Sequence, residues 1–141
     1  MPATVGVNKM SVVHASSNGI TNAFPDVCKT PSPAGPVPIP YPNMAMGPMG
    51  VPAAYNVLTF FAPTHNLMTT IPLTLGDQPG IALGVASGLV MGPSRRLTGA
   101  FTCLVGYAPV QRMTSMGIQN STNCPGVRLV PSQPKVIVLS P

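Results

Sequence analysis

The side chains of this chain that could do chemistry are few: three cysteines, two histidines and two acidic residues. Cys28 and Cys124 each lie in a polar turn that contains proline, His14 precedes a predicted turn, and His65 follows the end of a predicted strand. A structural zinc ion takes about four nitrogen and sulfur ligands in a closed tetrahedron, and two cysteines with two histidines are a permitted set. These four residues are therefore the candidate metal ligands. Their spacing matches no short zinc motif, so they would have to converge from distant turns.

The remaining candidates favour a structural role over a catalytic one. Cys103 lies in an apolar stretch, where a free cysteine usually acts as a small buried hydrophobic side chain, so we do not expect it to bind metal. Asp26 and Asp77 are the only carboxylate side chains available for acid–base chemistry, and both lie in predicted turns. Cys28 could pair with a histidine as a nucleophile, but no oxyanion hole or glycine-rich phosphate loop is evident. We therefore predict that the chain is not an enzyme; reactivity of the Cys28 thiol would indicate the alternative, a thiol-dependent enzyme.

Proline and glycine determine which elements can hold these residues. The chain has 141 residues, of which 19 are proline and 14 are glycine, while 45% are hydrophobic and only 6% are charged. An apolar chain interrupted in this way is typical of many short strands joined by tight turns, and no segment shows helical periodicity over a useful length. We predict one all-β domain over residues 1–141. No internal sequence repeat is evident.

Several segments have a specific prediction. Prolines alternate with other residues over 36–42, which excludes a helix or a central strand and indicates an extended arm or a sheet edge. A hairpin is predicted over 10–24, with Asn18-Gly19 in its turn. Further strands are predicted at 55–62, 67–75, 97–108, 127–130 and 135–139, a short helix or a strand pair at 81–91, and a polar loop at 117–126.

Charge and targeting signals limit the partners. The net charge of +5 comes from scattered basic residues without interleaved aromatics, so nucleic acid is not an expected partner. The low charge density predicts that much of the surface contacts another protein. The first 23 residues show no signal peptide, and no apolar run approaches the ~20 residues of a membrane-spanning helix. The odd number of cysteines argues against a disulfide framework.

Three runs near the start resemble a known family. They are His14-Ala-Ser-Ser-Asn-Gly19, Phe24-Pro-Asp-Val-Cys-Lys-Thr-Pro31 and Gly35-Pro-Val-Pro-Ile-Pro-Tyr-Pro-Asn43. Together they closely resemble the opening of PAAR-like domain proteins, the tip proteins of contractile injection systems such as type VI secretion systems and phage-tail-like particles. Looser similarity follows at 76–80, 84–88, 123–126 and 131–136.

The resemblance implies a small β-rich cone that caps a trimeric spike, one tip per trimer, and sharpens it for membrane puncture. In relatives, histidines and a cysteine hold a structural zinc ion at the apex. Cys28 lies in the matching Phe-Pro-Asp-Val-Cys motif and His14 in the matching turn. Many relatives carry His-Asn near the C-terminal end, where this chain has Gln119-Asn120, so Cys124 and His65 are predicted as the remaining ligands.

The resemblance also implies a place and partners. We expect assembly onto the injection particle in the bacterial cytoplasm, followed by release from the cell or delivery to a target cell, with transient contact with the target membrane. Some relatives carry a toxin domain after the tip; we expect no fused effector domain in residues 1–141, so that separate effector or toxin cargo could dock on the tip. The alternative from another functional class is an effector-loading adaptor of the same secretion system. Co-purification of one chain per three spike chains would indicate the tip, whereas binding to a toxin without the spike would indicate the adaptor.

Overall fold

The computed structural model describes residues 6–7, 10–11, 13–16, 19–59, 61–129 and 137–138. Within these residues the regular structure is β-strand, apart from the 3₁₀ turn η1 (Gly47–Met49), so the all-β prediction is confirmed. The strands are β1 (Gly6–Val7), β2 (Met10–Ser11), β3 (Ile20–Thr30), β4 (Val37–Met46), β5 (Ala54–Thr59), β6 (Ala62–Thr64), β7 (Thr70–Ile71), β8 (Ser94–Arg96), β9 (Ala100–Val105), β10 (Ala108–Val110), β11 (Met116–Gln119), β12 (Cys124–Arg128) and β13 (Ile137–Val138).

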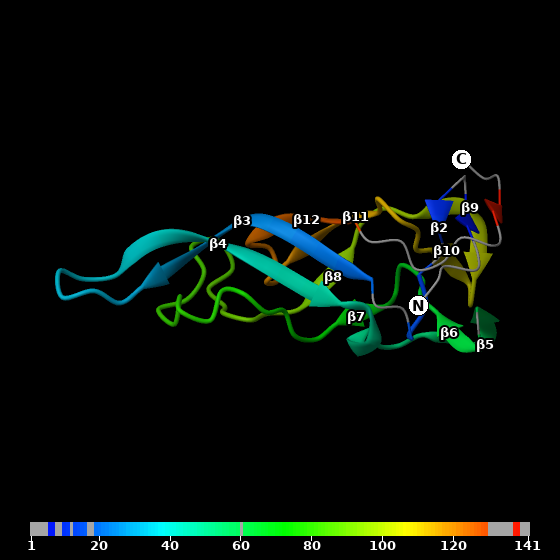
Figure 1. Ribbon diagram of the computed structural model, residues 1–141, viewed down its shortest axis with the longest axis horizontal. Helices are drawn as coiled ribbons and strands as arrows, with labels where there is room; N and C mark the ends of the chain where they lie inside the picture. Colours follow the sequence, from blue (N-terminus) through cyan, green and yellow to red (C-terminus); the bar gives the residue numbers. More distant parts are fainter. Residues whose placement is uncertain are drawn as a thin grey trace.

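The molecule is elongated and tapers toward one end (Figure 1). A six-stranded antiparallel sheet, in the order β4-β3-β12-β11-β8-β7, forms its middle. The long β3–β4 hairpin continues past the other strands and makes the narrow end (Figure 1). The short β5–β6 and β9–β10 hairpins and strand β2 lie at the opposite, broad end.

The prediction of an extended arm or sheet edge over 36–42 is confirmed, because residues 37–42 lie in β4, the edge strand of the sheet. Prolines have no N–H, so they can remain only where a strand has no partner to donate to. The hairpin predicted over 10–24 is wrong: β2 pairs with β1, and β3 pairs with β4. The loop predicted over 117–126 is also wrong, since it holds most of β11 and the start of β12. Residues 81–91 form turns, with neither a helix nor a strand pair.

An irregularity in β3 determines which of its side chains face inward. Thr21 and Ala23 are buried, and strict alternation would next bury residues 25 and 27. The pairing with β4 instead shifts between Ala23 and Asp26, and Asp26 and Cys28 are buried. A bulge re-aims the side chains that follow it. The Phe24-Pro25 step therefore turns Asp26 and Cys28 into the interior.

Three hairpins at the broad end share one register. The pair next to the turn is Val7 with Met10 in β1–β2, Thr59 with Ala62 in β5–β6, and Val105 with Ala108 in β9–β10. Each hairpin thus turns through two residues. The sequence shows no evident repeat, but the structure contains a threefold structural repeat.

A ring of backbone hydrogen bonds joins the three hairpins. In each hairpin, the residue three positions after the first paired residue of the second strand donates its N–H to the corresponding residue of another hairpin. Val13 donates to the Gln111 carbonyl (3.2 Å), Gln111 to the His65 carbonyl (3.1 Å), and His65 to the Val13 carbonyl (2.9 Å). These bonds close a triangle. The broad end therefore has approximate threefold symmetry within a single chain.

The interior is largely polar, with few large apolar side chains. Alanine, valine and cysteine make up most of the buried apolar residues, and the described residues form one small apolar cluster, of Ala100 and Val110 with Cys103 and Val105 against it. The largest fully buried side chains are Arg128, His14, His65 and Gln119. The fold thus depends strongly on hydrogen bonds in its interior, because each buried polar group needs a partner. No helix among the described residues is long and apolar enough to cross a membrane.

Candidate metal centre

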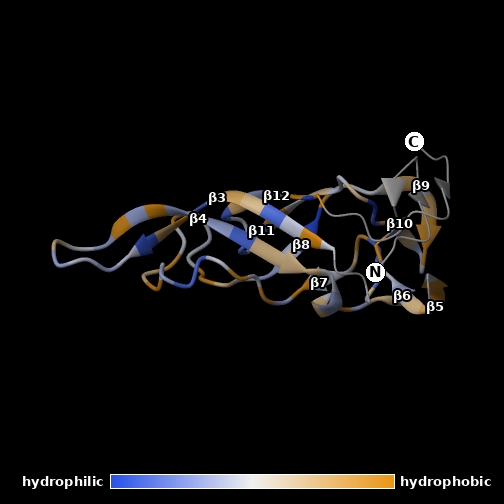
Figure 2. Cartoon of the chain, in the orientation of Figure 1, coloured by the Kyte–Doolittle hydropathy of each residue, from blue (hydrophilic) through white to orange (hydrophobic). Residues whose placement is uncertain are grey.

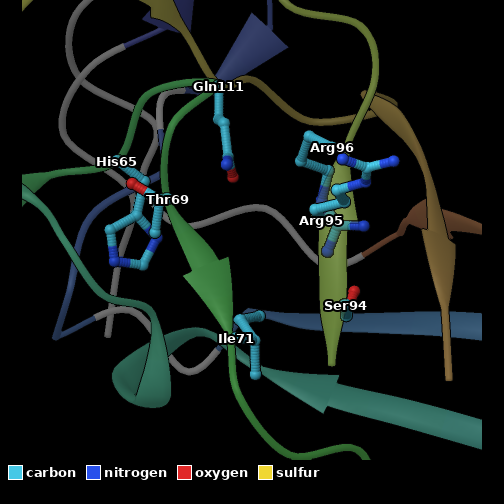
Figure 3. A pocket seen from close by; sticks show the side chains of 7 residues that line it. All are labelled: His65, Thr69, Ile71, Ser94, Arg95, Arg96 and Gln111. Atoms are coloured by element: carbon cyan, nitrogen blue, oxygen red, sulfur yellow. The ribbon is translucent and has the colours of Figure 1, made fainter. Parts of the chain in front are cut away.

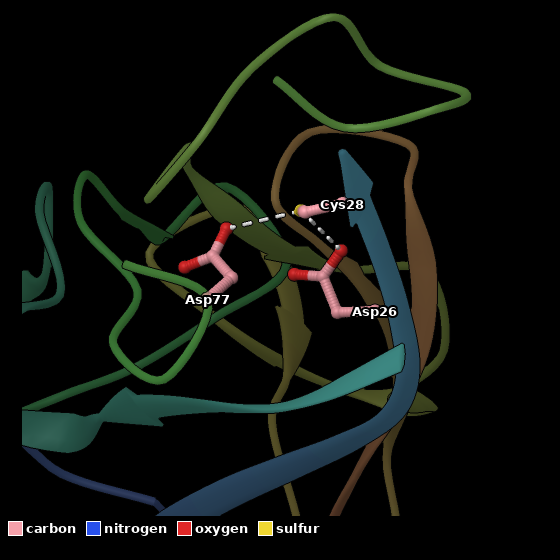
Figure 4. Close-up of side chains that lie close together, drawn as sticks. All are labelled: Asp26, Cys28 and Asp77. Carbon is pink, nitrogen blue, oxygen red and sulfur yellow. Dashed lines mark hydrogen bonds between the residues drawn. The ribbon is translucent and has the colours of Figure 1, made fainter. Parts of the chain in front are cut away.

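Three chemically active side chains meet in the narrow half of the molecule. Asp26 and Cys28 project from one face of β3, and Asp77 reaches them from a loop (Figure 4). The Cys28 Sγ lies 3.5 Å from Asp26 Oδ1 and 3.8 Å from Asp77 Oδ2. One ligand atom from each residue lies within 4.8 Å of the others, and all three residues are buried. This Asp26–Cys28–Asp77 cluster is close enough to bind a metal ion.

Amide groups surround the carboxylates of this cluster. The side-chain amide of Asn120 donates to Asp77 Oδ2 (2.8 Å), and those of Asn43 and Asn123 donate to Asp26. The side-chain oxygens of Asn120 and Asn123 accept hydrogen bonds from backbone N–H groups of the loop formed by residues 76–92. This fixes the orientation of both amides, with their N–H groups toward the carboxylates. Hydrogen bonds thus tie the cluster to the 76–92 loop.

The loop can approach Cys28 only because of a glycine. A Cβ on Gly80 would lie 2.2 Å from the Cys28 Cβ, far inside contact distance. The backbone of β3 also bonds this loop, since Lys29 donates to the Leu83 carbonyl (2.9 Å) and Val85 donates to the Val27 carbonyl (3.0 Å). The 76–92 loop is thereby packed onto β3 and covers the cluster.

Electrostatics at the cluster favour a bound cation. Burial, together with the Asp26 and Asp77 carboxylates, raises the pKa of the Cys28 thiol to about 12. Burial also raises the pKa of Asp77, to which the Asp26 charge contributes. The Asp77 Oδ1 atom is buried and has no hydrogen-bond partner among the described residues. A divalent cation would replace the thiol proton, and its charge would remove the repulsion between the two carboxylates.

The donor set narrows the choice of metal. Magnesium and calcium take oxygen ligands, whereas zinc accepts cysteine sulfur together with carboxylate oxygen. Cys124 lies in the same electrostatic environment: burial raises the pKa of its thiol to about 12, with Asp26, Asp77 and Cys28 contributing. Its Sγ donates to the Gln119 carbonyl (3.7 Å). A thiol and two carboxylates, with a second thiol nearby, fit zinc better than an all-oxygen metal.

A family model for the toxin PAAR-like domain matches residues 19–126. The chain belongs to this family. The match includes the whole of the Asp26–Cys28–Asp77 cluster and most of the six-stranded sheet. No curated protein and no solved structure matches the chain. PAAR-like domains associate with the spikes and effectors of secretion systems, so the chain is a spike-associated module of such a system.

The PAAR-like domain does not bring the four predicted ligands together. Cys28 and Cys124 lie in the narrow half, and among the described residues Cys28 is the only one of the four within a group of three possible ligands. His14 and His65 lie at the triangular ring instead, where His14 pairs with Thr64 and His65 donates to Val13. The set that the geometry supports therefore replaces both histidines with aspartates. Cys103 lies in β9, at the broad end, apart from the cluster.

The two histidines belong to a second polar cluster, rich in positive charge. Burial lowers the pKa of His65 to about 3, and the nearby Arg128, His14 and Arg96 contribute to that shift. Burial lowers the pKa of Arg96 to about 10 and that of Arg128 to about 9, so both remain charged at neutral pH. Figure 3 shows His65 and Thr69 across a small pocket from Arg95 and Arg96. Arginines around a neutral histidine make this a poor site for a metal cation.

Sequence reasoning counted Asp26 and Asp77 among the side chains that could bind a metal, but it chose neither as a ligand. A local signal was present for Asp26, since it follows Phe24-Pro25, and a proline inside a strand often marks a bulge that re-aims its neighbours. Asp77 lies in Gly76-Asp77-Gln78-Pro79-Gly80, a turn whose position over β3 is set by tertiary packing. No sequence pattern shows that this turn crosses β3.

Proposed function

We propose that this PAAR-like domain is the structural tip of a contractile injection system. In this proposal its broad end caps the distal end of a trimeric spike, and its narrow end points outward and sharpens the spike for membrane puncture. Family membership supports association with a spike. The chain would act without catalysis, because burial and two neighbouring carboxylates keep the Cys28 thiol protonated when no metal is bound, and a bound metal would occupy the thiolate.

The triangular ring is the observation on which this proposal depends. Val13, His65 and Gln111 close it, and each lies at the base of one hairpin. A trimeric partner with threefold symmetry presents three equivalent chain ends around its axis. A single chain can contact all three equally only if it offers three similar elements at similar spacing. The broad end meets this condition.

Exposed apolar side chains support the same end as the docking surface. Phe61 and Tyr107, at the hairpin turns, are 93% and 100% exposed. Leu58 and Leu104, at matching positions of β5 and β9, are both more than half exposed. Figure 2 shows hydrophobic colour along β5 and the β9–β10 hairpin. Several large apolar side chains exposed at one end of a molecule are typical of a protein interface.

The narrow end has a different requirement, which we propose that zinc meets. The taper leaves few side chains to pack around Cys28, and the residues buried with it are mainly polar. In this proposal the Cys28 thiolate, Asp26 and Asp77 hold the ion, with Cys124 as the fourth ligand. Structural zinc contributes on the order of 10 kcal/mol of apparent binding free energy in a volume no larger than a side chain.

The experiment compares charge placed at the two ends of the domain. A double variant, Leu58→Asp with Leu104→Asp, adds two charges to the proposed docking surface. Ile81→Asp is the matched control, because Ile81 is also highly exposed but lies on the loop over the metal cluster. Each variant is co-expressed with the cognate trimeric spike, and the amount retained on the purified spike is measured.

We expect the double variant to lose at least about tenfold in retention, since charge in a buried apolar contact is strongly unfavourable. The control is expected to bind like the unmodified domain. Equal retention of all three proteins would overturn the proposal. Retention by a toxin partner but not by the spike would instead support an effector-loading adaptor, the function that the word "toxin" in the family description suggests.

A further inference from the structure

Within the described part of the chain, only the first of the three hairpins of the broad end has its outer edge covered. β1 pairs with β2 on one side and with β13 on the other, and β13 runs parallel to it. β5 and β9 each pair only with their hairpin partner among the residues that the structure describes. The inner strands of the hairpins face the ring, where Ala15 donates to the Pro63 carbonyl and Leu67 to the Pro109 carbonyl.

The shared register shows which backbone groups are open. In a hairpin with a two-residue turn, the pair next to the turn exchanges both hydrogen bonds, so the next residue along the strand points its N–H and C=O away. That residue is Leu58 in β5 and Leu104 in β9. The equivalent residue of β1 is Gly6, which lies opposite Ile137 of β13. The edge that receives β13 is therefore the edge that β5 and β9 leave open.

The chain treats its exposed edges in two ways. β4, the long outer strand of the six-stranded sheet, carries Pro38, Pro40 and Pro42, which remove N–H donors and prevent another strand from pairing. The sequences of β5 and β9, Ala-Tyr-Asn-Val-Leu-Thr and Ala-Phe-Thr-Cys-Leu-Val, contain no proline and no charge. The pairing of both strands shifts register beyond Leu58 and Leu104, so the regular open edge is the short part next to each turn. Apolar edges without proline or charge are templates for strand addition.

We propose that β5 and β9 each accept an extended strand from the trimeric spike, running parallel to them, in the position that β13 takes on β1. This inference rests on the proposed function and specifies how the spike binds. The incoming strands would be apolar and free of proline, as β13 is with its Ile137 and Val138. The chain fills the third position itself, so two of the three spike chains add a strand and the third contacts β13.

Hydrogen exchange on the free domain and on its spike complex tests this directly. The Leu58 and Leu104 amides are expected to exchange quickly in the free domain and at least about tenfold more slowly in the complex, because they become hydrogen-bonded. The amide of Ile39, on the proline-protected β4 edge strand, serves as the reference and should not change. Unchanged exchange at both leucines in a saturated complex would overturn the inference.

A pair of substitutions separates strand addition from side-chain contact. Leu58→Pro removes the outward N–H without removing a bond within the hairpin, whereas Leu58→Ala keeps that N–H and removes most of the side chain. We expect the proline variant to bind the spike more weakly than the alanine variant, with thermal unfolding confirming that both fold. Equal binding by the two would overturn strand addition and leave the proposed function intact. The proposed function itself would be overturned by a different result: unchanged retention of the double aspartate variant on the spike.

Discussion

Cys28 is the residue on which the metal centre depends. Among the described residues it is the one thiol within 4.8 Å of both carboxylates, and its burial, together with these carboxylates, raises its pKa to about 12 and so disfavours a bare thiolate. A thiolate in this position needs a cation beside it. Cys103 offers a matched comparison, because it is partly buried in β9 at the other end of the molecule.

Cys28→Ser should therefore lower zinc content and thermal stability together, since serine is a poor zinc ligand. Elemental analysis and a melting curve measure the two effects. Cys103→Val should leave both nearly unchanged, with less than about 1 kcal/mol lost, because valine is a small apolar replacement. Unchanged zinc in the serine variant, or zinc loss in the valine variant, would contradict the ligand assignment.

Gly80 sets how closely the loop can approach Cys28. Gly80→Ala would place a Cβ 2.2 Å from the Cys28 Cβ, so it should lower zinc content and cost about 1–3 kcal/mol of unfolding free energy. Gly88→Ala is the control: it meets no atom within 4 Å, and its positive φ costs about 1 kcal/mol by itself. The prediction fails if both variants keep a full complement of zinc.

His65 should make the stability of the domain depend on pH. Its pKa is about 3 in the folded state and 6.5 in the unfolded chain, so the unfolded chain binds the extra proton between these values. The free energy of unfolding therefore falls as the pH drops from 6.5 toward 3, by up to about 1.4 kcal/mol per pH unit. His65→Gln, which copies Gln111 of the third repeat, should remove this contribution to the pH dependence of the unfolding free energy. Urea denaturation at several pH values measures the slope of that free energy against pH. Identical slopes for both proteins would contradict the prediction.

At the scale of elements, the 76–92 loop and β3 stabilise each other through Asn123. This side chain accepts from the Ala86 and Ser87 N–H groups and donates to the Val27 carbonyl (2.9 Å). Asn123→Ala should cost about 1–3 kcal/mol and increase amide exchange in the loop, because the buried Asp26 carboxylate and the loop N–H groups lose a partner. Asn56→Ala, on the exposed face of β5, should do neither. Equal exchange in the two variants would show that other contacts order the loop.

The sequence predicted elements where local chemistry decides them. Alternating prolines at 36–42 correctly predicted a sheet edge, because the missing N–H acts locally. The Asn18-Gly19 signal suggested a hairpin over 10–24, but long-range pairing with β4 determined where β3 lies. Two Ala-Pro pairs, 62–63 and 108–109, mark equivalent positions of two repeats, yet this signal is too short to reveal the third hairpin.

The candidate site was likewise predictable from the sequence only where local chemistry decides it. Cys28 was predicted from its motif, and it lies in the cluster. The two aspartates were assigned to turns, because neither the bulge in β3 nor the path of the loop follows from local sequence. His14 and His65 could be paired by residue type alone, but their place in the ring is set by the threefold repeat.

At the scale of the whole molecule, the two ends have separate tasks. The broad end offers three similar hairpins with exposed apolar side chains, whereas the narrow half holds a candidate metal centre beneath the 76–92 loop. This division fits a body that is held at one end and meets a target at the other. It also predicts that removing zinc with a chelator lowers the melting temperature but leaves the broad end able to bind the spike.

The stoichiometry of the complex tests the central claim most directly. A single chain whose three hairpins lie on the threefold axis of a spike should bind as one copy per trimer. Native mass spectrometry of the complex, purified after co-expression, should therefore give the mass of three spike chains and one PAAR-like domain. A mass with three domains per spike trimer would contradict the account.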